Sequence, residues 1–264
     1  MTLRYIALQI ESEIVGRMYS SDFAYHTRFI SNYFSKAIRK YKYTTDGTFN
    51  MISVEGAINY KEIPKIKGFD ALSVPISFDQ KRYEQIKGTE DCSYYLELLE
   101  QGFKKASEFK PIPLDTLLSL IDEFKKGGCK NEWLHKKKRF KEEDLEVVLT
   151  CEFTTNYFQL IATINQISTK KELVKGIVMK TKPDEIHFEK MFKDILIYEN
   201  FIVVTDASDS ARVLINIEDA KKGFFSKMFA PYIYSDDYTQ EENLKYEATH
   251  NEVVKILSYD GGGF

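Results

Sequence analysis

"LEVVLTCEFTTNYFQLIATI", Leu145 to Ile164, is the stretch of this chain that best decides its fold. Apolar residues occupy every second position on both sides of a short polar turn at residues 154–156. The set comprises Leu145, Val147, Leu149, Cys151, Phe153, Phe158, Leu160, Ala162 and Ile164. Glu146, Thr150 and Glu152 stand between them, and this period of two is typical of strands that bury one face. The stretch therefore predicts two strands joined by a turn.

The sequence beyond this stretch continues the strand pattern. Further strands are predicted at about residues 173–180, 195–198, 201–206 and 212–217. The Glu199–Asn200 step is short enough for a tight hairpin. Short connections and polar opposite faces predict an antiparallel meander with one face covered. A helix near residues 218–228 and a last strand at residues 252–259 complete the predicted C-terminal region.

Two amphipathic helices precede the meander. The first is predicted at residues 93–109, with Leu96, Leu99, Phe103 and Ala106 as its apolar stripe. The second carries Leu114, Leu117, Leu118, Ile121 and Phe124, and it ends at the Gly127–Gly128 pair. Because the meander needs a cover for its apolar face, we expect this helix pair to pack on it.

The N-terminal third has a mixed α/β pattern. Residues 3–10 and 49–58 predict strands, and Asp22 is expected to cap a helix that runs to about Tyr41. A third strand is predicted through Leu72, Val74, Ile76 and Phe78. Pro75 cannot donate a ladder hydrogen bond, so we expect this strand at a sheet edge.

These patterns predict an α+β fold. Residues 1–90 form an N-terminal mixed α/β part. Residues 91–264 hold the helix pair packed on the antiparallel β-meander, with a C-terminal helix and strand. A boundary near residues 88–92 separates the two parts.

Composition narrows the class of protein. The chain has 264 residues, 43% of them hydrophobic, and a formal net charge of -3, so no global field would attract nucleic acid or an anionic membrane. Cys92, Cys129 and Cys151 are odd in number and lack metal-type spacing, which predicts reduced thiols in a cytoplasmic protein. No apolar stretch approaches the roughly 20 residues of a membrane span. We expect a cytoplasmic protein without a membrane partner.

A basic run lies just before the first meander strand. It follows Trp133 and His135 and consists of Lys136, Lys137, Lys138 and Arg139. The acidic residues between 142 and 156 offset its positive charge. A nucleic-acid surface would add arginine and stacking aromatics over a broader face. We therefore interpret the run as a solvated connection entering a strand. Contact with an acidic partner and catalysis by His135 stay as alternatives, and nucleic acid is not an expected partner.

Catalytic and metal-binding patterns are weak. Asp206 ends a predicted strand and Asp209 lies in the following turn, so they are the best candidates for metal ligands, but no third ligand accompanies them. His26, His135, His187 and His250 are scattered, and no phosphate-binding glycine loop or nucleophile elbow occurs. We predict no cofactor and no catalytic residue. The Gly261–Phe264 tail is interpreted as a flexible end.

An acidic, tyrosine-rich segment, "YIYSDDYTQEENLKYE" from Tyr232 to Glu247, is the leading candidate for a binding surface. Tyrosine is favoured at protein interfaces, and carboxylates at a rim steer basic partners. The predicted partner-binding residues are Tyr234, Asp236, Asp237, Tyr238, Glu241 and Glu242. A solvated linker around a few packed tyrosines is the alternative.

Residues 93–217 also resemble a known class of proteins. A helix, then "FKKGGCKNEWLHKKKRF" (Phe124–Phe140), then a meander with "KPDEIHF" (Lys182–Phe188) and "ENFIVVTD" (Glu199–Asp206), is similar to immunity proteins of bacterial polymorphic toxin systems. The resemblance implies a cytoplasmic protein that blocks a toxin by direct contact. We expect a non-enzymatic protein-binding module with a basic protein partner. A metal-dependent enzyme acting on nucleic acid or phosphate substrates, and a structural or phage-type assembly protein, are the alternatives.

Overall fold

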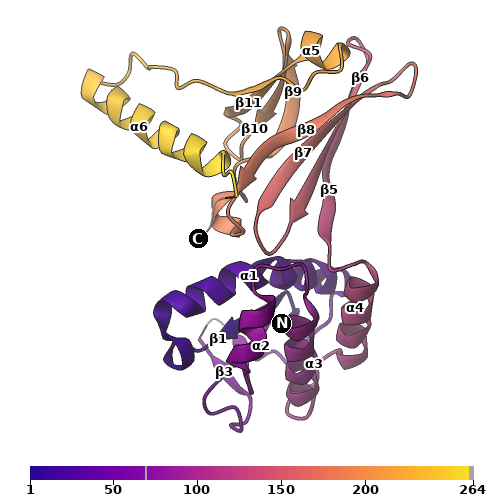
Figure 1. Ribbon diagram of the computed structural model, residues 1–264, viewed down its shortest axis with the longest axis vertical. Helices are drawn as coiled ribbons and strands as arrows, with labels where there is room; N and C mark the ends of the chain where they lie inside the picture. Colours follow the sequence, from indigo (N-terminus) through magenta and orange to yellow (C-terminus); the bar gives the residue numbers. More distant parts are fainter. Residues whose placement is uncertain (69, 262–264) are drawn as a thin grey trace. The chain divides into compact units, whose positions relative to one another are not determined.

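The computed structural model describes residues 1–68 and 70–261, and the chain divides into two compact units (Figure 1). The first unit is Met1–Asn131 with Thr154–Asn156. The second is Glu132–Phe153 with the described residues from Tyr157 onward. Helices and antiparallel strands both occur, so the predicted α+β class is confirmed. The boundary expected near residue 90 falls inside the first unit, and Gly262–Phe264 of the tail lie outside the described residues.

The first unit is built on a four-stranded sheet with the order β1-β2-β4-β3. Its elements are β1 (Tyr5–Ile10), α1 (Ser12–Tyr41), β2 (Met51–Gly56), β3 (Lys65–Lys67), β4 (Ala71–Ile76), α2 (Gln80–Ile86), α3 (Ser93–Ser107) and α4 (Leu114–Lys126). β1, β2 and β4 are parallel to one another, whereas β3 is antiparallel to β4. The mixed α/β pattern predicted for this region is therefore present.

Helix α1 protects the edge of this sheet. Ser35 Oγ accepts a hydrogen bond from Ile6 N at 2.9 Å and donates one to Ile6 O at 3.2 Å. Ser31 Oγ accepts a bond from Leu8 N at 3.2 Å. An open strand edge invites pairing with other chains, so these two helical serines satisfy groups on β1 that another strand would otherwise seek.

Strand β4 differs from its predicted position. It lies inside the sheet, between β2 and β3, and not at the edge. The reason is the shortness of β3, whose Lys65 pairs with Ser73 and which has no partner for Pro75. Proline is therefore accommodated by ending the neighbouring strand, and not by moving β4 to the edge.

The helix pair also differs from its prediction. Both helices belong to the first unit, where α3 packs on β4, β2 and β1. The approach is close, because a Cβ built on Gly102 would lie 2.4 Å from Val54 Cγ2. The predicted stripe is buried as expected, with Leu96, Leu99, Phe103 and Ala106 all at 0% exposure. Amphipathic spacing identifies the buried face of a helix, but it does not say which sheet that face covers.

A disulfide joins Cys92, at the start of α3, to Cys129, just after α4. The expectation of three reduced thiols is therefore wrong for this pair, while Cys151 is buried in β6. The bond closes a loop with a sequence separation of 37. Loops of this size gain about 2–4 kcal/mol from cross-linking, because the unfolded chain loses freedom.

The second unit contains two four-stranded sheets, with orders β5-β6-β7-β8 and β12-β11-β10-β9. Its elements are β5 (Asn131–Phe140), β6 (Leu145–Phe153), β7 (Phe158–Gln166), β8 (Glu172–Thr181), the 3-10 turn η1 (Glu185–His187), β9 (Asp194–Tyr198), β10 (Phe201–Thr205), β11 (Ala211–Asn216), α5 (Ile217–Lys221), β12 (Lys227–Phe229) and α6 (Gln240–Leu257). Strands that follow one another in the chain are neighbours in each sheet, which is the predicted meander.

The stretch from Leu145 to Ile164 forms the centre of this core. All nine predicted inward residues have 0–1% exposure. β6 and β7 pair antiparallel over their full length, so that Val147 faces Ile164 and Phe153 faces Phe158. Phe188, from the β8–β9 connection, stacks on Phe158 with ring centroids 3.6 Å apart. The predicted hairpin and its buried face are confirmed.

Two predicted elements of the second unit are wrong, and the helix predicted near residues 218–228 is limited to α5, because residues 227–229 form β12. The basic run is not a connection but part of β5, because Lys136–Arg139 lie within Asn131–Phe140. Residues 252–259 are not a strand, since α6 extends from Gln240 to Leu257. A capping box starts this helix, with Thr239 and Glu242 bonding each other's backbone N–H groups.

We expect Gly102→Ala to destabilise the first unit, although alanine favours a helix over glycine by about 1 kcal/mol. The new methyl group would meet both Val54 methyls, at 2.4 and 2.6 Å. Overpacking of this kind costs about 1–3 kcal/mol, which outweighs the helical gain. Urea unfolding followed by circular dichroism measures the difference.

Val54→Ala provides the matched control, because it removes the two methyl groups that the new Cβ would touch. The double variant should be more stable than the sum of the single effects predicts, by about 1 kcal/mol. Simple additivity, or a stabilising Gly102→Ala, would contradict the close packing of α3 on β2.

Candidate protein-binding surface

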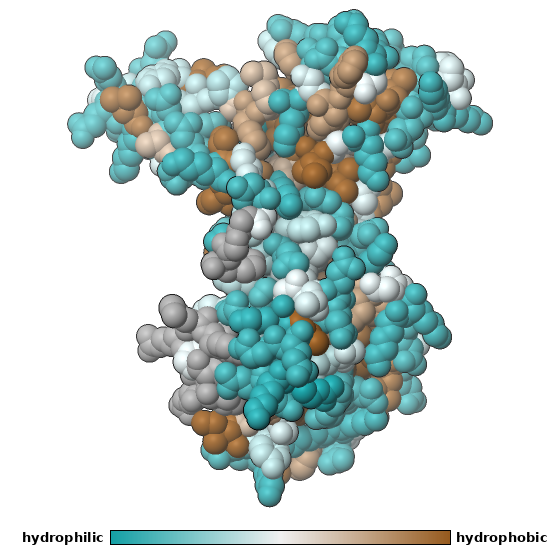
Figure 2. All heavy atoms as spheres, in the orientation of Figure 1, coloured by the Kyte–Doolittle hydropathy of each residue, from teal (hydrophilic) through white to brown (hydrophobic). Residues whose placement is uncertain are grey.

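Helix α6 is the least covered long element of the second unit. Of its 18 residues, only Asn243 and Leu257 are buried. Its C-terminal end reaches β8, through an isolated bridge between Ser258 and Lys180. Figure 1 shows its other end extending away from the sheets, and Figure 2 shows apolar residues exposed there among hydrophilic ones. Most of the side chains of α6 are therefore exposed to solvent.

Asn243 holds the preceding segment against the helix. Its Oδ1 accepts hydrogen bonds from Tyr232 Oη at 3.1 Å and from Ser235 N at 3.0 Å. Its Nδ2 donates to the carbonyls of Ser235, Tyr238 and Thr239 at 3.0–3.3 Å. One buried amide thus uses its donors and acceptor to fold residues 232–239 back along the first turns of α6.

Four tyrosines gather around this anchor, and we call them the tyrosine cluster: Tyr232, Tyr234, Tyr238 and Tyr246. The rings of Tyr232 and Tyr234 lie 5.5 Å apart, and those of Tyr238 and Tyr246 lie 5.0 Å apart. Tyr234 Oη donates to Glu247 Oε2 at 2.5 Å, and this bond raises the pKa of Tyr234. Partial burial and the neighbouring Tyr238 and Tyr246 raise the pKa of Tyr232. Tyr234 thus acts as a hydrogen-bond donor to Glu247.

The cluster combines fixed rings with exposed area. Tyr234, Tyr238 and Tyr246 are 51%, 45% and 45% exposed, although each has a ring or hydroxyl partner. Ile233, beside them, is 82% exposed. Aromatic side chains of this kind supply large contact area with little loss of freedom on binding. The arrangement suits contact with another macromolecule.

The predicted carboxylates divide into two kinds. Asp236, Asp237 and Glu241 are exposed beside the tyrosine cluster, and we call them the acidic rim. Glu242 accepts from Thr239 N at 2.8 Å and from Thr239 Oγ1 at 2.7 Å, and these bonds lower its pKa. Glu242 therefore serves the helix cap. The predicted segment had included Tyr232, Tyr246 and Glu247, but no sequence signal singled out Asn243 as the residue that holds it.

Two carboxylates of the second unit pair with the four cations of the basic run in β5. Lys136 and Lys138 lie 3.2 and 3.5 Å from Asp194, while Lys137 and Arg139 lie 2.9 and 3.5 Å from Glu146. Lys138 Nζ also donates to Ile195 O at 2.6 Å. The N–H of Ile195 and the Lys136 ammonium hold the pKa of Asp194 below its ordinary value. These ion pairs connect β5 to β6 and β9 and lower the positive charge that the run presents.

Asp206 and Asp209 have protein partners too. Asp206 accepts hydrogen bonds from Ser208 N and Ser210 N, and Arg212 pairs with its Oδ2 at 2.7 Å. Asp209 pairs with Lys193 at 2.7 Å. Within the described residues, no group of three His, Cys, Asp or Glu side chains is arranged to hold a metal ion. The turn at residues 206–210 is explained by these bonds.

The histidines and Asp22 also have structural partners. Asp22 does not cap α1 but lies inside it, where its Oδ2 accepts from Tyr83 Oη at 3.0 Å. His26 Nε2 lies 3.4 Å from Asp22 Oδ1. His135 Nε2 is 3.3 Å from Lys193 O, and its ring contacts Phe192 at 4.6 Å. These contacts orient the rings of His26 and His135 within the fold.

No protein-family model, curated protein or solved structure matches this chain. Among the described residues, no helix combines the length and the apolar character needed to cross a bilayer.

We expect Asn243→Ala to release residues 232–239 from α6. The substitution removes a buried amide, and it leaves the half-buried hydroxyl of Tyr232 and the backbone groups of Ser235 without their hydrogen-bond partner, at a cost of about 1–3 kcal/mol. Amide hydrogen exchange should accelerate over residues 232–247. Asn251→Ala, at an exposed position of the same helix, is the control, and equal exchange in both variants would contradict the anchoring role.

We expect the protein not to bind DNA or RNA at physiological salt, because Asp194 and Glu146 already pair with all four cations of the basic run. A gel-shift titration over a range of salt concentrations measures this. The variant with Lys136, Lys137 and Lys138 changed to Gln is the control. A salt-sensitive shift that the parent protein gives and the variant loses would overturn the expectation.

Proposed function

We propose that this chain is a non-enzymatic protein-binding module and that the tyrosine cluster with its acidic rim contacts the partner. The observation that carries the proposal is the long, largely uncovered α6, which buries only Asn243 and Leu257. Isolated helices in water are marginal, and most helices gain stability from a packed face. A partner that covers the exposed tyrosines would supply that packing.

The partner we propose is a basic protein. Residues 232–247 hold five carboxylates and a single lysine, and the three carboxylates of the acidic rim are exposed. Exposed charges beside an apolar contact area speed association with the opposite charge and add less to affinity. The tyrosines then supply the binding energy once the partner has arrived.

The resemblance to immunity proteins of polymorphic toxin systems suggests which kind of protein the partner is. We propose that the partner is a toxin and that the chain neutralises it in the cytoplasm by covering its surface. The metal-dependent alternative has less support, because Asp206 and Asp209 are engaged by Arg212 and Lys193. No described contact specifically favours an assembly protein.

Reversal of the acidic rim tests the surface. We expect the variant with Asp236, Asp237 and Glu241 changed to Lys to associate with the partner roughly tenfold more slowly or worse at low salt. Its thermal midpoint should stay near that of the parent, since the three side chains are exposed. Glu242 is left unchanged because it caps α6. Affinity capture from the native host, followed by binding kinetics, provides the measurement.

The matched control carries the same change of net charge elsewhere. Glu90, Glu108 and Asp122 are exposed in the first unit, and their reversal to Lys should leave association nearly unchanged. Equal slowing in both variants would show that only net charge matters and would remove the acidic rim from the proposal.

The toxin assignment has its own test. The product of the neighbouring gene should arrest growth when expressed alone, and co-expression of this chain should restore growth. We expect Tyr238→Ala to weaken the protection by faster dissociation, about 2 kcal/mol for an anchoring aromatic. The assignment would be contradicted if the product of the neighbouring gene did not arrest growth. It would also be contradicted if the Tyr238→Ala variant and the variant with the reversed acidic rim both protected the cells as fully as the parent protein.

A further inference from the structure

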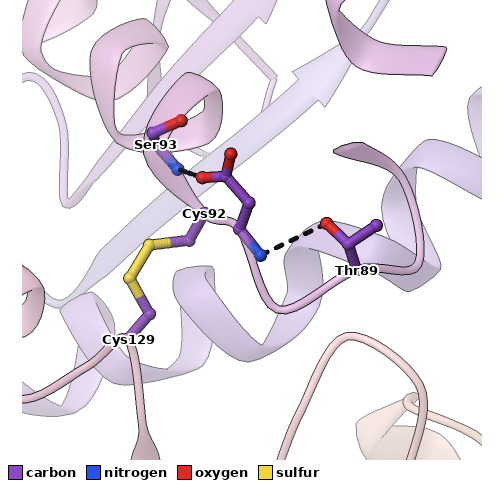
Figure 3. Close-up of a disulfide and its surroundings, with 5 residues drawn as sticks. Thr89, Cys92, Ser93 and Cys129 are labelled. Carbon is purple, nitrogen blue, oxygen red and sulfur yellow. Dashed lines mark hydrogen bonds between the residues drawn. A yellow bond between two sulfur atoms is a disulfide. The ribbon is translucent and has the colours of Figure 1, made fainter. Parts of the chain in front are cut away.

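The Cys92–Cys129 pair occupies a specific place in the first unit (Figure 3). Cys92 precedes the first residue of the 15-residue helix α3, whereas Cys129 follows the end of α4. Asp91 and Thr89 fix the approach to α3, since Asp91 Oδ1 accepts from Ser93 N at 2.8 Å and Asp91 N donates to Thr89 Oγ1 at 3.2 Å. The bond therefore joins a well-ordered helix start to the exit from another helix.

The two sulfur-bearing residues differ in access. Cys92 is 3% exposed, whereas Cys129 is half-buried. The two residues before Cys129 are Gly127 and Gly128, which have no side chains to shield it. Cys129 itself has a φ of 58°, following Gly128 at 71°, so both residues are in the left-handed conformation as the chain leaves α4, and a Cβ at Gly128 would have no heavy atom within 4 Å. An external reagent can thus approach the bond from the Cys129 side.

Charge around the pair favours exchange. Lys125, Lys126 and Lys130 are exposed in the sequence around Cys129 and attract anionic thiolates. Cys92 lies at the N-terminal end of α3, where the positive end of the helix dipole favours negative charge on a departing thiolate. Asp91 opposes part of this effect, because its carboxylate already occupies the Ser93 N–H. Attack at Cys129 with departure of Cys92 is the direction that access favours, because Cys92 is buried and Cys129 is half-buried.

We propose that Cys92–Cys129 is a thiol-exchange site that soluble dithiols open in the folded protein, with Cys129 as the sulfur attacked. The dithiol's thiolate forms a bond to Cys129 Sγ, the bond between Cys129 and Cys92 breaks, and Cys92 leaves with the electron pair. The dithiol's second sulfur then attacks the mixed disulfide and releases Cys129. The dithiol is oxidised to a cyclic disulfide, and the two protein thiolates take up protons. This inference is independent of the proposed partner surface.

The first experiment measures opening under native conditions with dithiothreitol as the probe. Samples are quenched with an alkylating reagent and read by intact and peptide mass. We expect both Cys92 and Cys129 to be labelled at a rate proportional to dithiothreitol concentration, while buried Cys151 stays unlabelled. A rate that is independent of dithiothreitol and equal to that of global unfolding would overturn the proposal. Three alkylated cysteines before any reductant is added, in air-oxidised protein, would overturn it as well.

The second experiment tests which sulfur is reached. In Cys92→Ser, oxidised glutathione should form a mixed disulfide on Cys129 at least about tenfold faster than it does on Cys92 in Cys129→Ser, because Cys92 is covered. Equal rates, or a faster reaction at Cys92, would contradict attack at Cys129. If either variant fails to fold, trapping the mixed disulfide of the parent protein with one equivalent of a monothiol, followed by peptide mapping, answers the same question.

Discussion

The strict alternation of buried and solvated residues in β6 and β7 is the constraint on which the second unit depends. Leu149 and Phe153 have no exposed surface, whereas Glu146 on the opposite face pairs with Lys137 and Arg139. If the pairing of β6 with β7 shifted by one residue, Glu146 would point into the core, and an unpaired charge there costs several kcal/mol. The alternation therefore fixes the register of β6 and β7. Phe188 from the β8–β9 connection then stacks on Phe158 of the buried face.

Sequence patterns predicted the elements whose period is unambiguous and missed those whose composition is misleading. β5 was not predicted, because a run of lysines has low strand propensity and its neutralising partner Asp194 lies far along the chain. The end of α6 was predicted as a strand, because Val253, Val254, Ile256 and Leu257 suit either structure as a short apolar run. The capping box at Thr239 and Glu242 was visible in the sequence and would have indicated the helix.

Long-range relations were the least predictable. The stripe of α3 was identified residue by residue, and that of α4 in part, since Leu120 is buried while Leu114 and Leu118 are half-buried. Yet α3 packs on the mixed sheet of the first unit, and α4 packs on α3 and α1. Gly102 contained the relevant signal, since a glycine inside an amphipathic helix indicates a close approach to another element. The Cys92–Cys129 bond was missed for a related reason, because a separation of 37 residues gives no indication that two helix ends meet.

The anchor of the candidate surface has a consequence for binding. A flexible tyrosine-rich linker would have to be ordered by its partner, at about 0.5–1.5 kcal/mol for each immobilised side chain. Here Asn243 has already fixed residues 232–239, and ring pairs orient the tyrosine cluster before any partner arrives. Because that ordering cost is met during folding by a single buried amide, more of the contact energy of the tyrosines remains available for affinity. The exposure of the tyrosine cluster and the burial of Asn243 are therefore two aspects of one arrangement, in which a rigid helix start presents aromatic side chains to solvent.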